Sequence, residues 1–430
     1  MALGLRALTT LAGSDVLDRL GLRGRAERAL NSATKSGFRA AGTAGKTFAR
    51  VSRNGKPARQ STGRRSDLFD LTPDDEQAMM REAVGDFAQK RFRPAALEAD
   101  DACAAPTELL AQAGELGITM LGVPEELGGA LSERSAVTSA LVTEALARGD
   151  MGLAVAALSP AAVATAIGLW GDSGQQGTYL PALVSDDAPA AALAIQEPSA
   201  LFDPFDLKST ASRSDDGFEL NGDKSVVARG VDADIFVVGA MLDDRPALFI
   251  VEASASGVLV EPKPAMGLRP AATANLKLER VSLPAESLLG EGSPDVYADC
   301  VRLGRIAWAA LAVGTAQAVV DYVIPYVNER VAFGEPISHR QAVAFKVADM
   351  ATELEGMRLV MLRAASRVDQ GLDFARESAL ARRIVAQKGM QIGSDGVQLL
   401  GGHGYIKEHP VERWYRDLRA AGVLEGGLLV

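Results

Sequence analysis

An acidic residue near the end of the sequence is the first candidate for chemistry. Glu425 lies in LEGGLLV, between a leucine and two glycines. A carboxylate held in an apolar site can serve as a general base, because burial and neighbouring charges tune its proton affinity. Chain ends, however, are usually frayed and tolerate change. Taken alone, the immediate neighbours of Glu425 therefore favour a solvated tail residue over a catalytic one.

Glycines follow an expected helix in the stretch QLLGGHGYIKEHPVERWYRDLR. Gly401, Gly402 and Gly404 would let the backbone approach another group closely, such as the phosphate of a dinucleotide. A turn that caps the C-terminus of a helix uses glycine in the same way. Both interpretations stay open from these residues.

Two further stretches combine polar residues with irregular backbone. RVAFGEPISHRQ places an arginine and a phenylalanine before a Gly-Glu-Pro turn, and AIQEPSALFDPFD lies where helical spacing gives way to strand spacing. Ordinary helix capping also explains the first stretch, and an ordinary interdomain loop explains the second. Either stretch could instead line a cleft.

The elements that position these stretches change type along the chain. Apolar residues recur at helical spacing through residues 66–190, which predicts an N-terminal α-helical domain. Thr72 before Pro73 is a helix start signal for this domain. Residues 191–296 consist of short alternating or β-branched segments separated by turn residues, which predicts a β domain that is closed or sandwiched. Asn221-Gly222 predicts a hairpin turn of the primed type within it.

Long helices return in residues 297–430 and predict a C-terminal four-helix bundle. The most apolar segment, IAWAALAVGTAQAVVDYVIPYV, is interrupted by polar residues, so we expect a buried core helix and no transmembrane span. Pro325 should kink or end this helix. The predicted fold class is α+β and multidomain, with the order α, β, α.

Composition excludes several classes of function. The 430 residues are 47% hydrophobic and 23% charged, as in a soluble globular protein. Two cysteines and three histidines show neither a disulfide framework nor a metal-ligand spacing, which favours a metal-free protein in a reducing compartment. No basic patch with interleaved aromatic residues supports nucleic-acid binding.

The first 65 residues form a basic arm. They contain 14 Lys and Arg against 3 Asp and Glu, while the remaining chain has a net charge of −21. A solvated flexible tail and a helix that contacts a membrane surface or a partner both fit this composition. We expect a cytoplasmic bacterial protein, or one of the mitochondrial matrix if the arm is a transit peptide.

The four candidate stretches, in this order and spacing, resemble the acyl-CoA dehydrogenase family over residues 66–430. The most specific part runs from RVAFGEPISHRQ to QLLGGHGYIKEHPVERWYRDLRAAGVLEGG, and it fits without a gap. The resemblance implies an N-terminal α domain, a central β barrel-like domain and a C-terminal four-helix bundle. It also implies FAD as cofactor, bound between the β domain and the bundle near a subunit interface.

The resemblance assigns two groups of residues to this cofactor. Gln196 and Ala228 stand where the family's β domain contacts the flavin ring. The other group would contact the FAD of a neighbouring subunit through positive charge, amide groups and close backbone approach. It consists of Arg330, Phe333, Gln341, Gln398, Gly401 and Gly402.

Glu425 falls where the family places its catalytic base, and Arg305 matches an arginine near that base. A minority of the family carries the base immediately before this arginine, where the present sequence has Gly304. The implied reaction is α,β-desaturation of an acyl-CoA thioester. Glu425 would remove the α-proton, flavin N5 would accept the β-hydride, and an electron-transfer flavoprotein would receive the electrons.

The flavin contacts of the β domain depart from the family pattern. Phe202 replaces a phosphate-binding serine, Val226 an aromatic residue, and Ala228 a hydroxyl donor. This leaves a homo-tetramer with FAD in each chain, or a hetero-oligomer in which this chain is a flavin-poor structural or regulatory subunit beside a homologous one. The family also continues with a helix after the base, whereas GGLLV follows here. We therefore expect a partner or a missing segment to cover Glu425.

Overall fold

The computed structural model describes residues 72–130, 134–185 and 187–430. The predictions for the basic arm, residues 1–65, lie outside this part of the chain. The first described helices are joined by short connections, and a π-helical turn, Ala88–Phe92, links the first two. These helices are α4 (Asp75–Phe87), α5 (Arg93–Ala102), α6 (Thr107–Gly114), α7 (Ala136–Gly149), α8 (Met151–Trp170) and α9 (Ser173–Leu183).

Helix α4 begins later than Thr72 and Pro73 led us to expect. Its N-cap is Asp74, whose carboxylate accepts a hydrogen bond of 2.8 Å from the backbone N–H of Gln77. The Gln77 side chain in turn accepts 3.2 Å from the backbone N–H of Asp74. This reciprocal pair satisfies two donors that the first turn leaves unpaired, so the helix begins at the capping box.

Helix α8 lies in the interior and connects the helical part to the sheet. Asp150 caps it by accepting from the backbone N–H of Leu153 at 3.0 Å. Ser159, buried halfway along α8, donates 2.8 Å to the backbone oxygen of Ala191 in the first strand. Helices α8 and α10 (Pro294–Glu329) are both long and apolar enough to span a membrane. In each, 83% of the most apolar window is buried inside the protein, so both are core helices.

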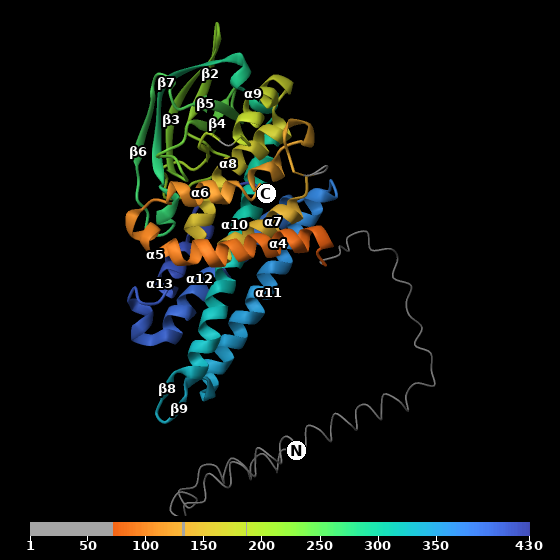
Figure 1. Ribbon diagram of the computed structural model, residues 1–430. Helices are drawn as coiled ribbons and strands as arrows, with labels where there is room; N and C mark the ends of the chain where they lie inside the picture. Colours follow the sequence, from red (N-terminus) through yellow and green to blue (C-terminus); the bar gives the residue numbers. More distant parts are fainter. Residues whose placement is uncertain (1–71, 131–133, 186) are drawn as a thin grey trace, which may run out of the picture. The chain divides into compact units, whose positions relative to one another are not determined.

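The middle of the chain forms one curled sheet that packs against α8 (Figure 1). Its hydrogen-bonded order is β1-β4-β2-β3-β7-β6, with β5 paired to the other side of β4. Inward-facing residues of different strands, such as Phe218, Phe249 and Leu276, form a second core cluster, which requires the sheet to curl around them. The strands are β1 (Ala191–Ala194), β2 (Thr210–Ser214), β3 (Gly217–Val227), β4 (Ile235–Leu242), β5 (Arg245–Glu252), β6 (Val258–Pro262) and β7 (Ala274–Pro284).

The predicted hairpin turn at Asn221-Gly222 is wrong, because both residues lie inside β3. The pairing of β3 with β7 shifts register between Leu220 and Gly222, so the pair marks a bulge. A Cβ on Gly222 would lie 2.6 Å from the Cα of Ser209, which explains the glycine. The primed turn occurs instead at Asp243-Asp244 between β4 and β5, where both residues have positive φ.

Three long helices dominate the C-terminal part, and α7 packs against two of them, α10 and α11. Pro325 does not end α10, which continues for one more turn to Glu329. A small hairpin, β8 (Val331–Ala332) and β9 (Glu335–Pro336), forms the tip between α10 and α11 (Figure 1). We propose that the chain consists of three domains, at residues 66–190, 191–296 and 297–430. The helices that follow the tip are α11 (Gln341–Asp369), α12 (Ala375–Leu400), α13 (Val411–Leu418) and α14 (Ala420–Val423).

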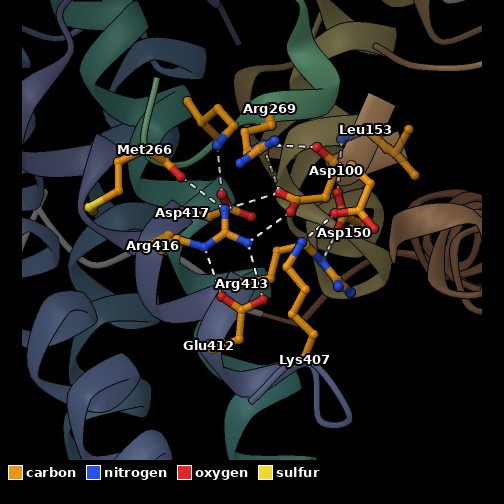
Figure 2. Close-up of polar contacts among 12 residues, drawn as sticks. Asp100, Asp150, Leu153, Met266, Arg269, Lys407, Glu412, Arg413, Arg416 and Asp417 are labelled. Carbon is orange, nitrogen blue, oxygen red and sulfur yellow. Dashed lines mark hydrogen bonds and ion pairs between the residues drawn. The ribbon is translucent and has the colours of Figure 1, made fainter. Parts of the chain in front are cut away.

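A buried charge network ties the three parts together around α13 (Figure 2). Arg416 binds Asp100 of α5 through two hydrogen bonds of 3.0 and 2.9 Å, and it donates 2.9 Å to the backbone oxygen of Met266. Arg413 pairs with the N-cap carboxylate of Asp150 at 3.0 Å. Because these charges are buried away from water, removing one partner of a pair would leave the other charge uncompensated.

Asp417 completes this network without a basic partner of its own. Its Oδ1 accepts 2.6 Å from the backbone N–H of Leu268, while its Oδ2 has no hydrogen-bond partner among the residues that the structure describes. Complete burial, reinforced by the negative charge of Asp150, raises the pKa of Asp417 to about 8. Asp417 is therefore protonated at neutral pH, and a proton on Oδ2 avoids leaving an unpaired charge in the core.

We predict that Asp417→Asn flattens the pH dependence of stability. Between about pH 4, where an unfolded aspartate titrates, and about pH 8, the folded state holds a proton that the unfolded state has lost. Stability therefore falls as the pH rises through this window. Asparagine should remove a slope of up to about 1.4 kcal/mol per pH unit.

Urea unfolding of both proteins from pH 5 to 9 measures this difference. Asp349→Asn, at an exposed aspartate of α11, is the matched control and should leave the slope unchanged. Parallel pH profiles for wild type and Asp417→Asn would show that Asp417 is already ionised in the folded protein.

Candidate active site

Glu425 is buried and does not lie in a solvated tail. It follows α14 directly and is 6% exposed. The turn through α14 brings it between α10, α12 and the end of β1, so that three separate parts of the chain surround its side chain. A carboxylate buried to this degree needs compensating charge.

Arg305 of α10 supplies the first positive charge. Its Nη2 donates 2.9 Å to Oε1 of Glu425, and its Nε donates 3.1 Å to Oε2. This two-pronged geometry matches the planar guanidinium to the planar carboxylate and fixes the rotamers of both residues. Arg305, which the resemblance placed near Glu425, thus contacts it directly.

Arg382 of α12 supplies a second positive charge, which sequence reasoning missed. Its Nε lies 2.9 Å from Oε1 of Glu425, and its Nη1 donates 2.6 Å to the backbone oxygen of Leu424. It also donates to the backbone oxygens of Ala421 and Gly422. Burial lowers the pKa of Arg382, and Glu425 opposes this shift. Nothing in the sequence around Arg382 sets it apart, since only the packing of α12 against α14 creates these contacts.

Backbone contacts hold the residues on both sides of Glu425. The N–H of Glu425 donates 3.1 Å to the side-chain oxygen of Gln196, and the indole N–H of Trp308 donates 2.6 Å to the backbone oxygen of Gly426. Gly426 has φ +63°, and a Cβ there would lie 2.5 Å from the side chain of Ile195. A glycine is therefore required directly after Glu425.

The residues that follow Glu425 are themselves buried. Leu428, Leu429 and Val430 belong to the main hydrophobic core. The backbone oxygen of Leu428 would be 3.1 Å from a Cβ on Gly304, so this segment runs directly over α10. Glu425 is thus buried within the described chain, and additional cover from a partner or a further segment stays a prediction.

The flavin-ring residues proposed from sequence lie beside Glu425. Gln196, Val226 and Ala228 line a small void together with Trp308 and Glu425. Its volume is about 10 Å³, close to that of a single water. A ring system needs a site of several hundred Å³, which this void alone does not provide.

The other proposed cofactor residues gather at the opposite end of the bundle and are all exposed. The hydroxyl of Tyr326, near the end of α10, donates 3.4 Å to the backbone oxygen of Leu400, which joins the ends of α10 and α12. Phe333 is 96% exposed at the hairpin tip. A Cβ on Gly401 or Gly402 would meet no atom of the described chain within 4 Å, so another group can approach this backbone. Arginine, amide and open glycine backbone suit the phosphates of a dinucleotide.

Models of one protein family match the N-terminal, middle and C-terminal parts of the chain. Family models match the acyl-CoA dehydrogenase N-terminal domain over residues 74–187, the middle domain over 192–281 and the C-terminal domain over 295–427. The predicted fold class is confirmed.

Individual relatives cover nearly the whole described chain. An acyl-CoA dehydrogenase of Bacillus subtilis (strain 168) is 33% identical over 360 residues, which span 82% of this chain and 94% of that protein. The structure of butyryl-CoA dehydrogenase from Megasphaera elsdenii aligns with a TM-score of 0.77 and 31% identity, covering 83% of this chain and 96% of that one. The FAD complex of PigA aligns with a TM-score of 0.77 and 26% identity over the same shares of the two chains. The chain belongs to the acyl-CoA dehydrogenase family, whose members depend on FAD.

Proposed function

We propose that the chain catalyses α,β-desaturation of an acyl-CoA thioester, with Glu425 as the base that removes the α-proton. The observation that carries this proposal is a buried carboxylate paired with Arg305 and Arg382 at the junction of the sheet and the bundle. FAD, when bound, supplies the acceptor for the β-hydride. We further propose a cytoplasmic location and an electron-transfer flavoprotein as the next electron acceptor.

The contacts of Glu425 favour Oε2 as the oxygen that takes the proton. Oε1 accepts from Nη2 of Arg305 at 2.9 Å and lies 2.9 Å from Nε of Arg382 in an ion pair, whereas Oε2 has one contact among the described residues, with Nε of Arg305 at 3.1 Å. A carboxylate oxygen has about two acceptor positions. Oε2 therefore keeps a free lone pair, and the two arginines hold the carboxylate in place while it is used.

Substrate binding requires a rearrangement next to Glu425. The void at this position has about 10 Å³, and Leu428, Leu429 and Val430, which follow Glu425 closely, are buried in the main hydrophobic core. An acyl chain would replace these apolar contacts with its own. We therefore propose that residues 426–430 move when the thioester enters.

A second candidate function is a flavin-poor structural or regulatory subunit of a heteromeric acyl-CoA dehydrogenase. It is favoured by the closed void beside Gln196, Val226 and Ala228, and by the half-buried Phe202, which packs against the core. In this alternative the chain would contribute its exposed bundle end to the FAD of a homologous partner. Its own Glu425 would then serve to fix the fold.

Replacing the carboxylate tests the first function. We expect Glu425→Gln to lower kcat for an acyl-CoA by about 10²–10⁴-fold, because a positioned general base contributes this much. Glu425→Asp keeps the charge but shortens the side chain, and it should give an intermediate rate. Glu329→Gln, at an exposed glutamate near the end of α10, is the control. A Glu425→Gln protein that keeps its melting temperature and full activity would remove Glu425 as the base.

Arg382 should act as a positioning residue for Glu425. Its Nε lies 2.9 Å from Oε1 of Glu425, and its Nη1 holds the backbone oxygen of Leu424. We therefore expect Arg382→Ala to lower kcat by about 10²-fold with little change in KM, because a misplaced catalytic group loses about this much. Arg382→Lys should keep most of the rate, and Arg383→Ala, at the exposed neighbouring arginine, should leave kcat unchanged. An unchanged kcat in Arg382→Ala, or a lower melting temperature with the same kcat, would show that Arg382 does not position Glu425.

Cofactor stoichiometry separates the two candidate functions. The purified chain is examined alone and after co-expression with a homologous subunit, and the flavin is quantified by its absorbance at around 450 nm. The dehydrogenase proposal predicts one FAD per chain in the isolated protein. FAD that appears only in the mixed assembly, at fewer than one per chain, would support the flavin-poor subunit instead.

A further inference from the structure

A group of metal-ligating side chains lies outside the proposed active site, in the turn between α12 and α13. It consists of His403, Glu408 and His409, which the sequence places within seven residues of one another. One ligand atom from each lies within 4.8 Å of the other two. The histidines alone have no recognisable metal spacing, and the site emerges only when the turn adds the carboxylate.

The turn that carries these side chains is anchored at several points. A Cβ on Gly404 would lie 2.3 Å from the backbone oxygen of Val397, so the turn packs directly on α12. Lys407, the basic residue of the turn, is paired with Asp101 of α5 and does not neutralise Glu408. The backbone is thus held in place while the three ligand side chains remain accessible.

His409 is oriented by aromatic neighbours on α10. Its Nδ1 lies 2.7 Å from the hydroxyl of Tyr322. Its ring packs edge-on against Tyr322, Tyr326 and His403, with centroids 5.9, 5.8 and 5.6 Å apart. With Nδ1 engaged by the hydroxyl, Nε2 is the nitrogen left for a metal. A histidine whose other nitrogen is hydrogen-bonded is the usual arrangement in metal sites, because the bond fixes the tautomer and the ring.

We propose that His403, Glu408 and His409 form a binding site for a transition-metal ion of the Zn²⁺ type. Two imidazoles and one carboxylate are a common ligand set for Zn²⁺, and three protein ligands leave a fourth position for water or another donor. The carboxylate of Glu408 adds one negative charge, which partly neutralises a divalent cation. The proposal does not depend on Glu425 or on the flavin.

Zinc binding is measured by calorimetric titration of chelator-treated full-length protein with ZnCl₂ at pH 7.5. We expect the protein to bind one equivalent of Zn²⁺ per chain. Co²⁺ in place of Zn²⁺ should give the visible absorption of a tetrahedral site. His403→Ala, at an exposed position that should not affect folding, is expected to weaken binding at least 10-fold, and His409→Ala likewise. Tyr322→Phe removes only the supporting hydroxyl and should weaken binding by about 10-fold, as outer-shell partners typically do.

His339→Ala is the control, because His339 is an exposed histidine of the hairpin tip. It should bind zinc as wild type does. Absence of stoichiometric zinc binding, or unchanged binding by His403→Ala and His409→Ala, would overturn the proposal.

Discussion

A buried carboxylate is stabilised either by a proton, as at Asp417, or by paired positive charge, and the region around Glu425 supplies two arginines. Arg305 comes from α10 and Arg382 from α12, so both long helices must be in place before Glu425 can be buried. Gln196 adds a contact from the end of β1. Losing one partner of a buried ion pair typically costs about 3–5 kcal/mol. The same contacts that hold the fold together therefore hold the candidate base in a single orientation.

The two proposed cofactor regions differ in accessibility. At the bundle end, Gly401 and Gly402 present open backbone beside exposed polar residues. Beside Glu425, the void lined by Gln196, Val226 and Ala228 has a volume of about 10 Å³. The sequence departures at Val226 and Ala228 therefore lie at a void that is itself too small for a ring system.

The positions of helices and strands could be predicted from the sequence better than the contacts between them. The α, β, α order followed from hydrophobic periodicity, and the spacing to Arg305 followed from the family resemblance. Arg382 could not be found, because its role arises from the packing of α12 against α14. Asn221-Gly222 has the composition of a turn, yet pairing with β7 makes it a bulge. Tertiary contacts overrode the local signal in both cases.

As the proposed base, Glu425 exchanges a proton with the α-carbon of a bound thioester. Incubating the flavin-loaded protein with a saturated acyl-CoA in D₂O, without an electron acceptor, and following deuterium at the α-carbon by mass spectrometry tests this step directly. We expect the wild-type protein to incorporate deuterium at the α-carbon and Glu425→Gln to incorporate none above background. Equal incorporation by both proteins would contradict it.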